Sequence, residues 1–121
     1  MAKRILVADD ERAIVNLAKR ALEIKGYQID FAYNGKDALD IAKSKYQNNE
    51  SIDLLISDTD MPVMNGHELI KEIKNLDNKI KIMQMSGYGG NVKSEHADAF
   101  LKKPFEIDKF YESVEKLLLS E

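Results

Sequence analysis

Five short apolar runs, each followed by a stretch with helical or turn-like character, constrain this chain more than any other feature. The runs cover residues 5–8, 28–32, 52–57, 80–85 and 99–102. The first and third are continuously apolar at their centres, as in strands that are buried on both faces. Between the runs, apolar residues recur at three- and four-residue intervals, which is typical of one helical face. Strands that alternate with helices predict an α/β protein with (βα) repeated five times around a parallel sheet.

The fourth of these helices is the weak part of the pattern. Residues 87–98 contain Gly87, Gly89 and Gly90, half of the six glycines in the chain. Each glycine disfavours a helix by about 1 kcal/mol relative to alanine. We therefore expect a short or irregular fourth helix, of one or two turns around residues 92–97. The stripe over residues 107–118 predicts the last helix most clearly.

Length and charge narrow the class of protein. The 121 residues fit one domain, residues 1–121. A net charge of −3 argues against a broad basic surface for nucleic acid. The absence of cysteine excludes a disulfide scaffold, a thiol nucleophile and thiolate zinc sites. With neither a membrane-length apolar stretch nor a signal peptide, we expect a cytoplasmic protein without membrane insertion or direct contact with nucleic acid.

Polar side chains stand where four of the five predicted strands end. They are Asp9 and Asp10, Asp58, Ser86, and Lys102 with Lys103. Ligands of open parallel sheets bind beyond the carboxyl ends of the strands. Clustered carboxylates repel one another unless a cation lies among them, and a few oxygen ligands suit Mg²⁺. A carboxylate is also a nucleophile toward phosphorus, and an ammonium and a hydroxyl supply the positive charge and positioning that phosphoryl transfer needs.

Each of these features also has an ordinary structural explanation. The acids at positions 9–11 suit a helix start, Asp58 and Ser86 suit turns, and a lysine pair suits a solvated surface. Their joint placement on one edge of the same sheet is much harder to explain in this way. The combination therefore favours a phosphoryl-transfer site.

The residues at these strand ends resemble the receiver domain of two-component response regulators. The resemblance rests on residues 5–11 (ILVADDE), residues 58–62 (DTDMP) with Asn65-Gly66, residues 85–87 (MSG) and residues 100–105 (FLKKPF), and it covers essentially the whole chain. It implies a three-layer, doubly wound, flavodoxin-like fold with a five-stranded parallel sheet in the order 2-1-3-4-5.

The resemblance also assigns roles to site residues. Asp58 would be the phosphoacceptor. Asp10 and Asp58 would bind Mg²⁺ directly, Asp9 would do so through water, and the backbone carbonyl of Asp60 would be a further ligand. Lys103 would contact the phosphoryl group, whereas its neighbour Lys102 would not.

Two further residues would form the conformational switch of the family. Ser86 would bind the phosphoryl group by a hydrogen bond, and Phe100 occupies the position of the switch aromatic. The bond between Lys103 and Pro104 is expected to be cis, against a general frequency of about 5–6% for X–Pro bonds.

The sequence departs from the family pattern in three places. The spacing from Ser86 to Lys103 is shorter than usual by roughly five residues, and the missing piece falls on the fourth helix. Phe100 lacks the hydroxyl group of a tyrosine, so a switch there would work by packing. Asp60 places a carboxylate beside the phosphorylation loop, where it either orients water for hydrolysis or repels the incoming phosphoryl group, and Tyr88 lies two residues beyond Ser86.

We therefore expect a phospho-accepting, single-domain receiver without a covalently attached output domain, which catalyses only its own phosphorylation and dephosphorylation. A histidine kinase or a phosphotransfer protein would supply the phosphoryl group. The signal would pass to a downstream protein by contact, near the last strand and the last helix, from a monomer or a phosphorylation-dependent dimer.

Two alternatives remain open at this point. A degenerate receiver would act as an interaction module independent of phosphorylation. A haloacid-dehalogenase-like phosphatase would use residues 58–60 as its Asp-x-Asp pair. Against the phosphatase, Pro62 stands where Thr or Val is usual, and the motif follows the third strand and not the first.

Overall fold

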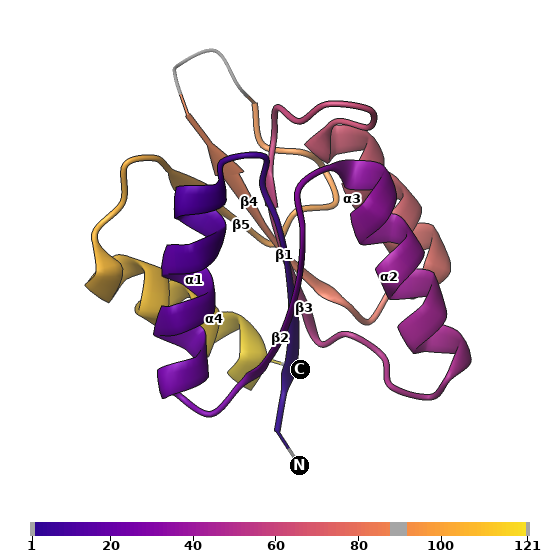
Figure 1. Cartoon of the computed structure of the whole chain (residues 1–121), viewed down its shortest axis with the longest axis horizontal. Helices are drawn as coiled ribbons and strands as arrows, with labels where there is room; N and C mark the ends of the chain where they lie inside the picture. The colour runs from indigo at the N-terminus through magenta and orange to yellow at the C-terminus, as the bar shows by residue number, and fades with distance from the viewer. Residues whose placement is uncertain (1, 88–91, 121) are drawn as a thin grey trace.

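Five parallel strands form a single sheet in the order β2-β1-β3-β4-β5 (Figure 1). The computed structural model describes residues 2–87 and 92–120. The strands are β1 (Arg4–Ala8), β2 (Gln28–Ala32), β3 (Leu54–Asp58), β4 (Lys81–Ser86) and β5 (Ala99–Lys102). The α/β class and the strand order are those expected from the sequence.

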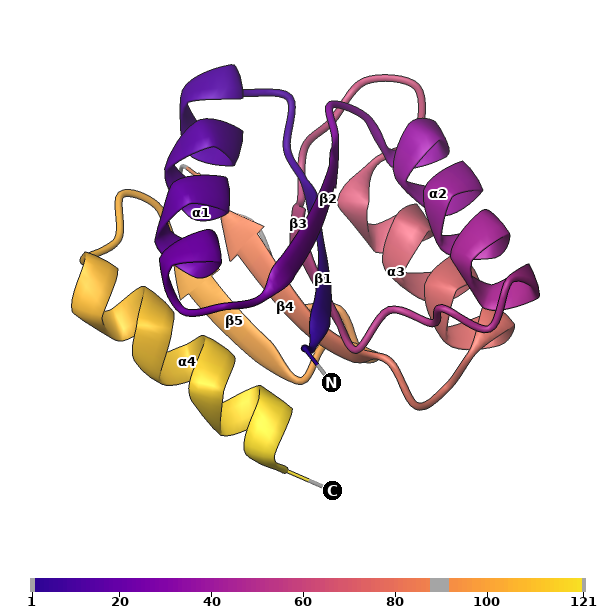
Figure 2. The ribbon, with the colours of Figure 1, turned by 60° about the horizontal axis from the view of Figure 1, so that its bottom comes forward.

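Four helices among the described residues cover the two faces of this sheet. They are α1 (Arg12–Ile24), α2 (Gly35–Gln47), α3 (Gly66–Leu76) and α4 (Ile107–Leu119). Helices α1 and α4 lie on one face, and α2 and α3 lie on the other (Figure 2). The result is the three-layer, doubly wound architecture.

Alternate residues of each central strand enter different cores. In β1, Leu6 and Ala8 pack on the side of α2 and α3, whereas Ile5 and Val7 pack on the side of α1 and α4. All four are fully buried. Strands β1 and β3 are buried on both faces, which is why their sequences are continuously apolar.

No helix forms at residues 92–97, the part of the chain where the sequence allowed at most one or two turns and predicted a short or irregular fourth helix. The described residues between β4 and β5 contain only a turn, closed by a hydrogen bond of 3.0 Å from the Ala97 amide to the Ser94 carbonyl. Other partners hold this backbone: the Ser94 amide donates to the Gln84 side chain, and the Asp98 amide donates to the Ile82 carbonyl. Tyr88, Gly89 and Gly90, which also figured in the sequence prediction, lie outside the described residues.

The remaining boundaries differ from the predicted ones by one or two residues, the normal scatter at element ends. The Lys103–Pro104 peptide bond is cis, as expected. Every helix of the described residues falls short of the length and apolar character that a membrane crossing requires.

Candidate functional site

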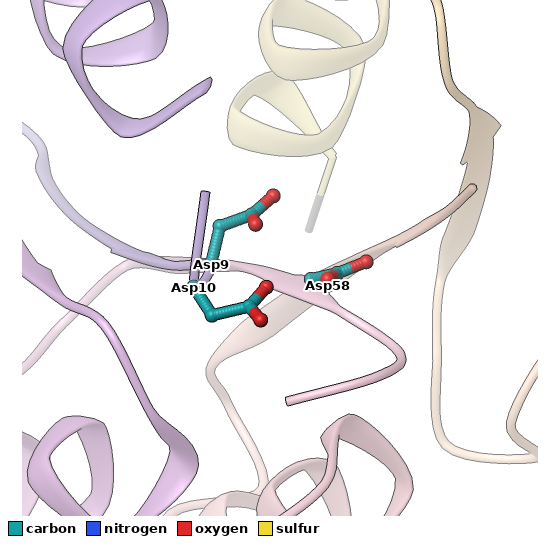
Figure 3. Close-up of side chains that lie close together, drawn as sticks. All are labelled: Asp9, Asp10 and Asp58. Carbon is teal, nitrogen blue, oxygen red and sulfur yellow. The ribbon is translucent and has the colours of Figure 1, made fainter. Parts of the chain in front are cut away.

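Three carboxylates meet where β1 and β3 end. The register pairs Ala8 of β1 with Ser57 of β3, so the residues that follow, Asp9 and Asp58, are neighbours. Asp9, Asp10 and Asp58 each offer a carboxylate oxygen within 4.8 Å of the others. Figure 3 shows the three side chains close together. Asp9 and Asp58 are buried, whereas Asp10 is exposed to solvent. This convergence is what the strand-end pattern predicted.

The ammonium group of Lys103 joins two of these carboxylates. Its Nζ lies 2.7 Å from Oδ2 of Asp9, 3.4 Å from Oδ1 of Asp58 and 3.1 Å from Oε1 of Glu11. Only 8% of the Lys103 side chain is exposed. The Lys103 amide also donates to the Ser86 carbonyl over 2.7 Å, which fixes the lysine to the end of β4. Lys102, by contrast, is exposed.

Burial and mutual repulsion shift the pKa values of the site. Burial and the charge of Asp9 raise the pKa of Asp58 to about 6, although Lys103 partly offsets them. Burial also raises the pKa of Asp9. Burial lowers the pKa of Lys103, but its bond to Asp9 and the charges of the carboxylates outweigh this effect and raise it. The site therefore holds more negative charge than its one lysine neutralises.

The loop after Asp58 is held against it by backbone contacts. The Thr59 amide donates to Oδ1 of Asp58 over 2.9 Å. The Gly66 amide donates to the Thr59 carbonyl over 2.7 Å, and a Cβ at Gly66 would lie 2.1 Å from the Asp58 carbonyl oxygen. Only glycine fits there. Asn65 caps α3 by accepting from the Glu68 amide, which accounts for the Asn-Gly pair in this loop.

The carboxylates at the start of α1 do not serve as a helix cap. Glu11 occupies the N-cap position and makes no side-chain capping hydrogen bond. The Glu11 amide instead donates to Oδ1 of Asp9 over 2.9 Å, which orients that carboxylate within the site. The capping explanation is therefore insufficient for these acids.

The other predicted site residues lie nearby in different environments. Ser86 is buried at the end of β4, and Asp60 is exposed in the loop after β3. Phe100 is half-buried on β5, directly opposite Gln84 of β4 in the strand register.

Sequence reasoning assigned no site role to Glu11 or Thr59. The signal for Glu11 was its place in the acidic run after β1. The signal for Thr59 was its hydroxyl group, directly beside Asp58 in the sequence. The sequence did not show that this hydroxyl would donate a hydrogen bond to Met85 of β4.

The donor set fits Mg²⁺. Carboxylate oxygens are the ligands that hard divalent cations prefer, and Mg²⁺ needs only one or two of them beside water and phosphate. Burial and the charge of Asp9 raise the pKa of Asp58, so repulsion between these carboxylates remains although Lys103 partly offsets it. A divalent ion among Asp9, Asp10 and Asp58 would relieve that repulsion.

Comparisons with known proteins agree with this arrangement. The family model described as the response regulator receiver domain matches residues 5–115. The chain is 34% identical to the sporulation initiation phosphotransferase F of Bacillus subtilis, over 98% of this chain and 95% of that protein. It is 32% identical to the sensor kinase CckA of Brucella abortus over 94% of this chain, but it spans only 12% of that kinase.

A solved structure supports the same fold. The receiver domain protein from Methanospirillum hungatei JF-1, described as CheY-like, superimposes with a TM-score of 0.84 at 28% identity, over 98% of this chain and 94% of that one.

Proposed function

This chain belongs to the response regulator receiver family, and from that premise we propose that it accepts a phosphoryl group on Asp58 and thereby switches its contacts with other proteins. The observation that carries the proposal is the buried Asp58 carboxylate with the Lys103 ammonium 3.4 Å from Oδ1 and two further carboxylates beside it. Receiver domains are signalling modules, so the chemistry serves regulation of a partner.

The proposed reaction is a transfer between two nucleophiles. A carboxylate oxygen of Asp58 forms a bond to phosphorus, and the N–P bond of a phosphohistidine on a histidine kinase or phosphotransfer protein breaks. The electron pair of that bond returns to the ring nitrogen of the donor. Lys103 lies where its ammonium can stabilise the charge of the transferring oxygens, and its low exposure limits competition from water.

Asp9, Asp10 and Asp58 would hold Mg²⁺, with the Asp60 carbonyl as a further ligand. The ion would supply positive charge to the phosphoryl oxygens when bound. Asp9 orients Lys103 by its 2.7 Å contact and is itself oriented by the Glu11 amide. Ser86 would hydrogen-bond the phosphoryl group, and Phe100 would follow by repacking.

The exposed carboxylate of Asp60 should affect how fast phosphorylated Asp58 forms or is hydrolysed. It either orients a water molecule for hydrolysis of the acyl phosphate or repels the incoming phosphoryl group. Replacing Asp60 with Asn should therefore change the lifetime of phosphorylated Asp58, measured as phosphate loss over time. An unchanged lifetime would remove any kinetic role for this side chain.

Intact mass spectrometry tests the central proposal. The protein is incubated with phosphoramidate and Mg²⁺, beside Asp58→Asn and a matched control, Asp53→Asn, at the opposite end of β3. We expect one added phosphoryl group in the wild type and in the control, and none in Asp58→Asn or in EDTA. No gain in the folded wild type with Mg²⁺, together with no gain from a phosphohistidine donor, would favour the phosphorylation-independent interaction module. Turnover of a phosphate ester would favour the phosphatase.

A further inference from the structure

A polar side chain lies in the interior of β4 where the sequence is otherwise apolar. Gln84 is fully buried, and its neighbours Met83 and Met85 are buried on the opposite face of the strand. Burying an amide is costly unless its donors and acceptor are hydrogen-bonded. The partners of this amide therefore indicate why it is present.

The Gln84 amide joins the phosphorylation loop to the segment between β4 and β5. Its Nε2 donates to Oγ1 of Thr59 over 2.9 Å and to the Val92 carbonyl over 3.1 Å. Its Oε1 accepts from the Ser94 amide over 2.7 Å. Both donor hydrogens and the acceptor are thus used, and each end of the side chain reaches a different part of the chain.

Thr59 continues this connection to Asp58. Its hydroxyl accepts from Gln84 and donates to the Met85 carbonyl over 2.7 Å, while its amide donates to Oδ1 of Asp58. A continuous series of hydrogen bonds therefore runs from the Asp58 carboxylate to the Ser94 amide. Beyond it, the Ser94 hydroxyl is hydrogen-bonded to Nδ1 of His67 on α3.

The connected segment is the one where the sequence predicted a short or irregular fourth helix and the described residues form none. Residues 92–98 contain a single turn, so side-chain bonds take the place of helical hydrogen bonds in holding the backbone near Ser94. Val92 and Lys93 are exposed, which puts the end of the connection at the molecular surface.

We propose that Gln84 is a positioning residue that couples the chemical state of Asp58, through the Thr59 hydroxyl, to the conformation of residues 92–94. Phosphorylation attaches a larger and more highly charged phosphoryl group to one carboxylate oxygen of Asp58, which changes the acceptor offered to the Thr59 amide. Thr59 and the Gln84 amide adjust together because both are buried and fully hydrogen-bonded. The exposed backbone at Val92–Ser94 is then held differently in the two states.

This route is separate from the proposed switch at Ser86 and Phe100, although Phe100 lies opposite Gln84 in the register. It rests on the proposed function, since it needs a modified Asp58. Its experimental signature is that removal of one hydroxyl, at Thr59, disconnects Ser94 from Asp58.

Amide NMR of the full chain tests the coupling. Wild type, Thr59→Val and the conservative control Thr59→Ser are each saturated with beryllofluoride and Mg²⁺, with bound fluoride followed by ¹⁹F NMR. We expect the Ser94 amide resonance to move on saturation in the wild type and in Thr59→Ser, and to stay in place in Thr59→Val. A wild-type response in Thr59→Val, or a lost response in Thr59→Ser, would overturn the coupling.

A second variant tests whether the Gln84 side chain holds the backbone at Ser94. Gln84→Met keeps the length of the side chain and removes all three hydrogen bonds, so hydrogen exchange at the Ser94 amide should accelerate about tenfold. Unchanged exchange would overturn the positioning role. If beryllofluoride does not bind the wild type and no phosphoryl group is taken up, the proposed function fails and the coupling fails with it. Binding without a response at Ser94 refutes the coupling alone.

Discussion

The buried charge of the Asp58 carboxylate should lower the stability of the unmodified protein relative to a variant with a neutral side chain at this position. Replacing Asp58 with Asn keeps the size of the side chain and removes its charge. Because burial and the charge of Asp9 raise the pKa of Asp58 from 3.8 to about 6, the charged form is disfavoured in the folded state. We therefore expect Asp58→Asn to be more stable than the wild type when no divalent cation is present.

The size of the effect follows from the pKa shift. A shift of one unit corresponds to about 1.4 kcal/mol, so a shift of about two units places the cost of the charge at about 3 kcal/mol at pH 7.5. Asp58 is only 5% exposed, so solvent screens this cost weakly. For a domain of this size the gain corresponds to a rise in Tm of roughly 10 °C.

Thermal unfolding followed by circular dichroism in EDTA measures the difference, with Asp40→Asn as the control. Asp40 carries an exposed ion pair with Lys36, so its replacement should change the stability little. Between pH 3.8 and about 6 the folded state binds more protons at Asp58 than the unfolded state. The wild type should therefore lose stability relative to Asp58→Asn as the pH rises through this window, and the two should converge below it.

Mg²⁺ should reduce the difference between the two proteins. A ligand that binds only the folded state stabilises it, and Asp58→Asn has lost one of the proposed ligands. The reasoning would be refuted if Asp58→Asn were no more stable than the wild type at pH 7.5 in EDTA while the control behaved as expected. It would also be refuted if the stability difference did not depend on pH.

Two further substitutions test the construction of the site. Lys103→Met removes the cation between buried carboxylates, so it should destabilise the fold by about 3 kcal/mol in chemical denaturation and slow phosphoryl uptake about 100-fold in timed mass spectrometry; equal effects from the exposed control Lys102→Met would contradict this. Gly66→Ala would place a Cβ 2.1 Å from the Asp58 carbonyl oxygen and should lower the stability by about 2 kcal/mol or more in the same denaturation assay. Gly87→Ala, whose Cβ meets nothing within 4 Å, should not, and a similar loss in both variants would refute the close-packing argument.

The positions of the strands could be predicted because the physics is local. A run such as residues 5–8 is apolar throughout, as is typical of a strand that is buried on both faces of a sheet. The convergence of Asp9, Asp58 and Lys103 followed from one further rule, that parallel strands end at the same edge. The sequence left the fourth helix uncertain, and at residues 92–97 the backbone is held partly by side-chain bonds from Gln84, which a periodicity argument does not detect.

The finer contacts of the site depend on distances between residues far apart in the sequence. Glu11 and Lys103 are 92 positions apart, yet their side chains are 3.1 Å apart. Gln84 left a trace in the sequence, as a polar residue inside the apolar run of β4, but its three partners lie in two loops whose paths only the structure gives. Such contacts need the tertiary structure because no pattern along the chain encodes them.

The two outer strands of the sheet also affect how the molecule meets its neighbours. Strand β5 has four residues and ends at the exposed Lys102, and β2 begins at the exposed Gln28 and carries Asp30, which pairs with Lys45 over 3.7 Å. Short or charged borders of this kind are poor templates for an added strand from a second molecule. Edge-to-edge strand pairing between two molecules is thereby disfavoured.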